Sequence, residues 1–230
     1  MAKTGGGNRH SKAASVELIR DPKKRARREA RNALSQFNLA LDIIGDWLRP
    51  GRKFHLSPSP ILLLHKEALD GLSLYAGTYR NGPIKIGKSR HAPPEAHLVP
   101  TLVQEMCDYV NRNWRRTALH LCAYAMWRLN WIHPFTDGNG RTSRMVAYVI
   151  LCVRLGYVLP GTQSVPEQIA ANKTPYYDAL EIADKNFGKG KIDVSRLEDL
   201  LSGMLAKQLY GIHAAAAQGR GHQRRRRRFH

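Results

Sequence analysis

Two segments of the sequence are apolar on nearly every side of a helix, and they constrain the fold more than any other feature. They are residues 117–130 (TALHLCAYAMWRLN) and residues 144–156 (RMVAYVILCVRLG), the second closing on Gly156 as a C-cap. Helices that are apolar all round belong in the protein core. The loop between them, which contains WIHPFTDGNG, is therefore expected to be held between the two best-buried elements, as precise sites require.

The remaining patterns predict an all-α protein. Apolar residues three and four apart indicate a helix from about Asp21 to Pro50-Gly51, with Leu34, Phe37, Leu41, Ile44 and Leu48 on its inner face. Further helices are expected over residues 61–74, around Val99 to Val110, over residues 164–186 and over residues 195–212.

One segment, AGTYRNGPIKIGKSRHAPP, has a different period. Two short β-like runs, Thr78–Arg80 and Ile84–Ile86, flank Asn81-Gly82, a dipeptide typical of tight hairpin turns. Pro83 cannot donate a ladder hydrogen bond, which favours an edge position. We therefore expect a small hairpin that either pairs with an extended segment of another chain or serves as a connector.

The charge is concentrated at the two ends of the chain. The 230 residues carry a net charge of +19 with a pI near 10.3, of which +7 lies in residues 1–31 and +6 in residues 219–230. We expect residues 1–20 and 213–230 to be disordered basic tails. The basic start of the first helix, KKRARREAR, is interpreted as a solvated extension, and contact with nucleic acid or a membrane surface is the alternative. The basic tails are candidate binding sites for nucleic acid or another polyanion.

The cysteines and the hydropathy indicate an intracellular protein. Cys107, Cys122 and Cys152 lie in apolar helical stretches without metal-ligand spacing, so we expect buried free thiols. We find no secretory signal and no apolar run long enough to span a membrane. The expected location is the cytoplasm, or export as an effector without such a signal.

The loop and the start of the next helix, HPFTDGNGRTSR (133–144), have the chemistry of a nucleotide-transfer site. Gly138-Asn139-Gly140 can form a backbone anion nest at a helix N-terminus. Arg141 and Arg144 would offer forked donors to phosphate oxygens. Asp137 is an oxygen ligand suited to magnesium, and His133 can take a proton near neutral pH.

This sequence resembles the signature of the Fic (Fic/DOC) family, HxFx(D/E)GNGRxxR, with every fixed position present. The flap-like YRNGPIKIGKSRHAPP and Tyr176-Tyr177 in YYDALEIA also resemble family segments. The resemblance covers residues 33–210 and implies a Fic domain at 21–212, an all-helical bundle with a β-hairpin flap over the active site.

The resemblance implies an adenylyltransferase that moves AMP from ATP to a Tyr, Thr or Ser hydroxyl of a target protein. By position, His133 would be the general base and Asp137 would hold Mg²⁺. Gly138, Asn139 and Gly140 would cradle the α and β phosphates, while Arg141 and Arg144 would stabilise the outer ones. Phe135 would anchor the loop in the core.

Other roles implied by the resemblance lie outside the signature. The flap residues Ile84, Lys85, Ile86 and Gly87 would pin the target by main-chain pairing, and Tyr176 and Tyr177 would contact the nucleotide. None of the eight glutamates fits the family's inhibitory pattern (S/T)xxxE(G/N) in its expected place. The protein would then be a toxin whose inhibitory glutamate is supplied by a separate antitoxin-like partner, or an enzyme without an inhibitor.

Two alternatives remain open from the sequence. The first keeps the fold but uses another donor, which would transfer UMP, GMP or phosphocholine. The second is a nucleic-acid-binding protein whose basic tails dominate and whose Fic core is vestigial.

Overall fold

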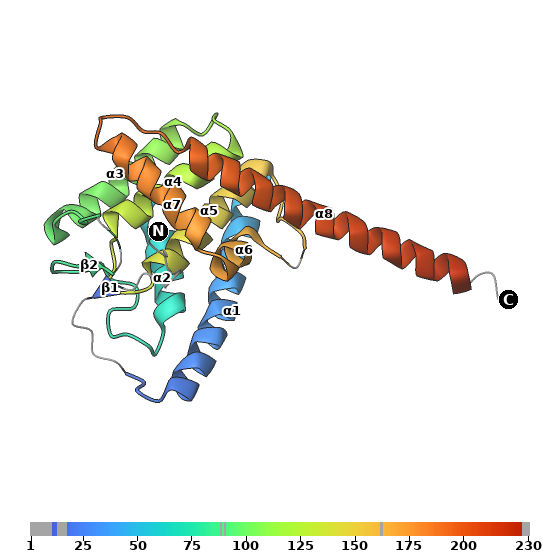
Figure 1. The fold of residues 1–230 in the computed structure, drawn as a ribbon, viewed down its shortest axis with the longest axis horizontal. Helices are drawn as coiled ribbons and strands as arrows, with labels where there is room; N and C mark the ends of the chain where they lie inside the picture. Colours follow the sequence, from blue (N-terminus) through green and yellow to red (C-terminus); the bar gives the residue numbers. More distant parts are fainter. Residues whose placement is uncertain (1–10, 13–17, 88, 90, 162, 227–230) are drawn as a thin grey trace, which may run out of the picture.

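The computed structural model describes residues 11–12, 18–87, 89, 91–161 and 163–226, with side chains described between residues 18 and 210. The strands are β1 (Ser11–Lys12) and β2 (Lys85–Ile86), and a short 3₁₀ helix spans Ala96–Leu98. The α-helices are α1 (Pro22–Trp47), α2 (Pro58–Leu69), α3 (Val99–Arg112), α4 (Ala118–Ile132), α5 (Asn139–Leu155), α6 (Val165–Ala171), α7 (Thr174–Phe187) and α8 (Ser195–Arg226). Figure 1 shows these helices gathered into one body from which the end of α8 projects.

Helices α4 and α5 form the centre of this body. Helix α4 packs against α3, α5, α7 and α8, while α5 also contacts α1, α2 and α6. Both carry buried residues on every side, as their apolar sequences predict. The three cysteines are free and buried. The predicted all-α fold class is thus confirmed, with the chemistry-bearing loop between the two central helices.

Helix α1 begins where the sequence predicts, because the Asp21 side chain accepts a hydrogen bond from the Lys24 N–H at 2.8 Å. Its buried face differs from the predicted one. The buried residues lie four apart at Asn32, Gln36, Ala40 and Ile44, whereas Leu34 is 68% exposed. Two polar side chains are tolerated inside because Asn32 and Gln36 donate to backbone C=O groups of α2 and its C-cap.

The predicted hairpin is wrong. In the described ranges the one β ladder is antiparallel and pairs Ser11 with Ile86 and Lys12 with Lys85. Gly82 lacks the positive φ that a tight hairpin turn needs. The Arg80 N–H instead donates to the Pro134 C=O at 2.9 Å, so the first β-like run is bound to the loop after α4.

Two boundaries also differ from the prediction. Residues 164–186 form two helices, since the helix is interrupted at Asn172-Lys173 and α7 begins at Thr174 with Pro175 in its first turn. Helix α8 continues to Arg226, so most of the predicted tail at 213–230 has a helical backbone. Residues 1–10, 13–17 and 227–230 of the predicted tails lie outside the described residues.

Nothing in the described part of the chain qualifies as a membrane-crossing helix by length and apolar character.

The buried face of α1 generates a stability prediction. Ile44→Ala should lower the free energy of unfolding by about 2–5 kcal/mol, because Ile44 is fully buried beside Ala40 and its truncation leaves a cavity. Leu34→Ala, on the exposed side of the same helix, should stay within about 0.5 kcal/mol of the parent. Urea denaturation followed by circular dichroism measures both, and equal losses would contradict the observed face.

Candidate active site

The loop between α4 and α5 turns through two residues in left-handed conformation. His133 ends α4 with φ 52° and ψ 59°, and it is the one non-glycine residue of the described chain with a positive φ. Gly138 precedes α5 with φ 75°. Because this conformation costs energy for a residue with a side chain, the contacts around His133 must hold it.

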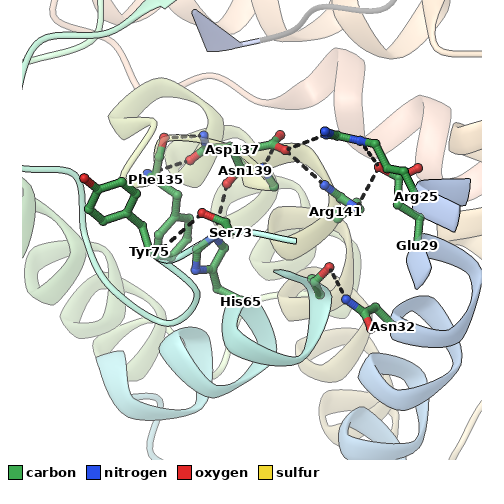
Figure 2. A network of polar contacts seen from close by, with 12 residues as sticks. Arg25, Glu29, Asn32, His65, Ser73, Tyr75, Phe135, Asp137, Asn139 and Arg141 are labelled. Carbon is green, nitrogen blue, oxygen red and sulfur yellow. Dashed lines mark hydrogen bonds and ion pairs between the residues drawn. The ribbon is translucent and has the colours of Figure 1, made fainter. Parts of the chain in front are cut away.

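A buried clamp fixes the middle of the loop (Figure 2). The Phe135 ring stacks on the His65 ring with their centroids 3.7 Å apart. The Asn139 side chain accepts from the Phe135 N–H at 2.9 Å and donates to the Phe135 C=O at 2.7 Å. Asn139 therefore closes the loop as a side-chain bridge, and only its backbone remains for the predicted anion nest.

His65 of α2 positions Asp137. Its Nδ1 accepts from the Gly77 N–H at 3.0 Å, so Nε2 carries the proton and donates to the Asp137 C=O at 3.0 Å. Burial lowers the pKa of His65 to about 4, which keeps the ring neutral at pH 7. The ring is thus a fixed hydrogen-bonding spacer beneath the loop.

Arg80 positions the other end of the loop. Its Nε donates to the His133 C=O at 2.8 Å and its Nη1 to the Gly82 C=O at 3.0 Å. Its Nη2 donates to the C=O groups of Pro94 and Ile132. This guanidinium is 4% exposed and bonds only to backbone carbonyls in these contacts, so it joins the flap segment to the end of α4.

The loop opens onto a pocket of about 540 Å³, within the usual range of small-molecule sites. Residues of the loop, of α5 and of four other segments line it, most of them polar: Arg25, Glu29, Ile86, Ser89, His91, Asn130, Trp131, His133, Asp137, Gly138, Asn139, Gly140, Arg141, Arg144, Lys173, Tyr177, Leu180 and Asp184. Every predicted residue from His133 to Arg144 except Phe135 lines this pocket, while Phe135 is buried behind it.

His133 has the environment of a neutral base. Its Nδ1 lies 3.3 Å from the Asn130 C=O, which can only accept, so Nδ1 carries the proton and Nε2 can receive one. Burial, with a smaller effect of Arg80, lowers the pKa of His133 to about 4. The imidazole is therefore neutral at pH 7, with one proton on Nδ1.

The start of α5 faces the pocket and has the features that favour a bound anion. The first helical hydrogen bond runs from the Thr142 N–H to the Gly138 C=O, so the N–H groups of Gly140 and Arg141 precede it. Arg141, Arg144 and Lys173 add positive charge. Burial, and to a smaller extent the positive charges of Arg144 and Arg141, lower the pKa of Lys173.

Asp137 has the chemistry of a magnesium ligand. Its Oδ1 accepts from the Gly138 N–H at 2.6 Å and its Oδ2 lies 3.4 Å from Arg141 Nη2. The described residues contain no cluster of three or more His, Cys, Asp or Glu that could hold a metal alone. Magnesium commonly uses one or two carboxylates together with substrate phosphates, and Asp137 supplies one.

Of the predicted site residues outside the signature, only some line the pocket. Tyr177 lines it, whereas Tyr176 is 1% exposed beneath it and its hydroxyl accepts from Asn130 Nδ2 at 2.7 Å. Of the four flap residues, Ile86 lines the pocket and Ile84 is buried in the core.

Sequence reasoning missed several residues of the site. Arg25 and Glu29 reach the pocket from the basic start of α1, which is therefore not simply a solvated extension. Glu29 lies 4.0 Å from Arg141, although it does not match the inhibitory pattern. One feature of the sequence could have indicated His65 and Arg80, since each is a polar residue within an otherwise apolar or β-like segment.

The fold and the pocket together define an all-helical protein with a pocket-lining polar loop between its two central helices. The family model described as "Fic/DOC family" matches residues 55–151, and the chain therefore contains a Fic/DOC family domain. The signature residues 133–144 lie within the matched segment.

Curated relatives agree with this assignment, and solved structures share the fold. Protein adenylyltransferase Fic of Drosophila willistoni is 31% identical over 138 residues, which cover 58% of this chain and 26% of that protein. The chain thus spans about a quarter of the length of the curated relatives it matches. Fic-1 of C. elegans in its E274G form has a TM-score of 0.65 at 22% identity, covering 87% of this chain and 55% of that one. A Fic family protein of Desulfovibrio desulfuricans G20 has a TM-score of 0.58 at 22% identity, covering 85% and 67%.

Gly138 generates a prediction about the loop. A Cβ there would lie 2.4 Å from Leu69 Cδ2, and the φ of 75° disfavours any side chain. Gly156 has a similar φ of 88° but open space around it. Gly156→Ala should lower the free energy of unfolding by about 1–2 kcal/mol. Gly138→Ala should lower it by about 1–3 kcal/mol more than Gly156→Ala does, because its Cβ is also crowded.

A double-mutant cycle separates crowding from backbone strain. Adding Leu69→Ala should recover part of the Gly138→Ala loss and none of the Gly156→Ala loss, because only the first glycine contacts Leu69. Urea denaturation provides the free energies of unfolding of the parent, the three single variants and the two double variants. Strict additivity of Gly138→Ala and Leu69→Ala would contradict the close approach.

Proposed function

We propose that this protein is a nucleotidyltransferase that moves AMP from ATP to the hydroxyl group of a Tyr, Thr or Ser side chain on another protein. The observation that carries the proposal is the pairing, in one pocket, of a neutral histidine with a cation-lined helix N-terminus. The name of the curated relatives, protein adenylyltransferase, supports AMP as the transferred group.

In the proposed reaction the hydroxyl oxygen of the target attacks the α phosphorus of ATP. The new oxygen–phosphorus bond forms as the bond between the α phosphorus and the bridging oxygen to the β phosphorus breaks, and pyrophosphate leaves. The hydroxyl proton passes to Nε2 of His133, whose other nitrogen is held by the Asn130 C=O. A neutral imidazole is ready for this role at pH 7 without first losing a proton.

The phosphates of the nucleotide would lie along the start of α5. The backbone from Gly138 to Gly140 faces the α and β phosphates, and Arg141 and Arg144 balance the charge of the outer ones. Asp137 would hold Mg²⁺, which neutralises phosphate charge when bound. A side chain in place of Gly140 would approach Arg144, since a Cβ there lies 3.2 Å from Arg144 Nη1. Glycine therefore leaves room for the diphosphate portion.

The position of the label in ATP tests the reaction. With a lysate as the source of target and Mg²⁺ present, label at the α phosphate should appear on protein and label at the γ phosphate should not. His133→Ala should reduce transfer at least about 100-fold, because general-base catalysis typically contributes 10²–10⁴-fold. The measurement is the initial rate of protein labelling after gel separation.

A matched control keeps this test specific. His97→Ala, at a histidine whose side chain is 70% exposed outside the pocket, should label at the parent rate. Transfer of the γ label would assign a kinase instead and contradict the proposal. Stronger inhibition by excess UTP or GTP than by unlabelled ATP would reassign the donor.

The flap is proposed as the place where the target's main chain docks. Residues Ile84–Gly87 include β2, and Ile86 lines the pocket beside the loop. In the structure the backbone of β2 already pairs with Ser11–Lys12 of the same chain. An extended target segment that uses this edge must therefore displace β1.

Proline substitution in β1 tests this competition. Ser11→Pro with Lys12→Pro removes two backbone N–H donors and should raise the initial rate of target labelling severalfold, because the β2 edge becomes available. Ser11→Ala with Lys12→Ala keeps both donors and should leave the rate near that of the parent. An unchanged rate in the proline variant would mean that the target does not dock at this edge.

A further inference from the structure

Helix α1 contributes two charged residues to the pocket from outside the family-matched segment. Arg25 and Glu29 lie one turn apart on α1 and both line the pocket, whereas the match begins at residue 55. Figure 2 shows both side chains reaching from α1 toward Asp137 and Arg141. The nucleotide roles proposed above use neither of them.

The four side chains form a closed ring of alternating charge. Arg25 Nε lies 3.4 Å from Glu29 Oε1 and Arg25 Nη2 lies 4.0 Å from Asp137 Oδ2. Arg141 Nη2 lies 3.4 Å from the same Asp137 oxygen, and Arg141 Nη1 lies 4.0 Å from the same Glu29 oxygen. The guanidinium groups of Arg25 and Arg141 therefore face common anionic oxygens from two different helices.

The backbone of α1 is fixed at this point. Arg28, on the turn after Arg25, pairs with the Asp70 carboxylate and donates to the Asp70 C=O at 3.0 Å. Asn32 donates to the same C=O at 2.8 Å. These contacts tie the basic start of α1 to the end of α2, so Arg25 is presented to the pocket by an anchored helix.

We propose that Arg25 is a third arginine of the nucleotide site and binds the outer phosphates together with Arg141. Both guanidinium groups already approach one negatively charged oxygen, Asp137 Oδ2, so the space between them suits an oxygen of that charge. A terminal phosphate presents such oxygens in a geometry that arginine binds with two donors. This inference rests on the proposed function, since it presumes a nucleotide in the pocket.

The effect of removing the Glu29 charge on nucleotide affinity distinguishes phosphate binding by Arg25 from a purely structural role. Its carboxylate holds Arg25 Nε, but it also places a negative charge 4.0 Å from Arg141, where it would repel a phosphate. If Arg25 binds phosphate, loss of its charge weakens nucleotide binding while loss of the Glu29 charge strengthens it. If the ring only holds α1 in place, removing either charge weakens binding.

The test is isothermal titration calorimetry of the full chain with Mg²⁺ and α,β-methylene ATP, whose α–β bridge cannot be cleaved. Arg25→Ala should weaken binding roughly 10-fold or more, as expected for a lost hydrogen bond to a charged group, and Arg25→Lys should weaken it less. Glu29→Gln should tighten binding. Arg27→Ala, an exposed arginine of the same helix, is the matched control and should bind like the parent.

Titration with AMP locates the contact. AMP lacks the outer phosphates, so Arg25→Ala should change its affinity by less than about 2-fold. Thermal unfolding by circular dichroism confirms that each variant is folded. An equal loss for AMP and the triphosphate, or weaker binding in both Arg25→Ala and Glu29→Gln, would overturn the proposal.

Failure of this inference and failure of the proposed function give different results. If the parent binds no nucleotide, the proposed function fails and this inference fails with it. If the parent binds the triphosphate and Arg25→Ala binds it as tightly as Arg27→Ala does, only the role of Arg25 is refuted.

Discussion

The loop between α4 and α5 keeps its shape because Phe135 is buried against the His65 ring while Asn139 bridges the Phe135 backbone in both directions. Such a clamp is needed because the loop contains His133, a side-chain-bearing residue in a left-handed conformation. Arg80 adds the second restraint by binding the His133 C=O from the flap segment. The site is therefore strained locally and stabilised by buried side chains, of which Asn139 also lines the pocket.

Rigid placement of the loop explains how two opposite chemical demands are met within a few residues. At one end, burial keeps the His133 ring neutral and able to accept a proton. At the other end, the start of α5 and the neighbouring cations create a region that favours negative charge. The carboxylates of Asp137 and Glu29 balance part of that charge. Negative charge favours binding at this end of the pocket, and the phosphates of the proposed nucleotide would supply it.

The sequence predicts the features that depend on neighbouring residues, but not those that depend on contacts between residues far apart in the chain. The apolar segments around 117–130 and 144–156 and the contiguous residues from His133 to Arg144 predict a rigid polar loop, and the structure contains it. His65 and Arg80 act on this loop from 72 and 53 residues away, and no periodicity reports such contacts. The Asn81-Gly82 turn was overridden for the same reason, since the Arg80 N–H bonds to Pro134 instead of to a hairpin partner. Pro175, by contrast, was a visible signal for the break between α6 and α7.

The most direct test of this account is a crystal structure of the protein with Mg²⁺ and a non-hydrolysable ATP analogue. The account predicts the α phosphate at the start of α5 within reach of the His133 imidazole, with the outer phosphates between Arg25 and Arg141. A nucleotide whose phosphates point away from α5, or one bound outside the pocket lined by His133 and Arg144, would contradict it.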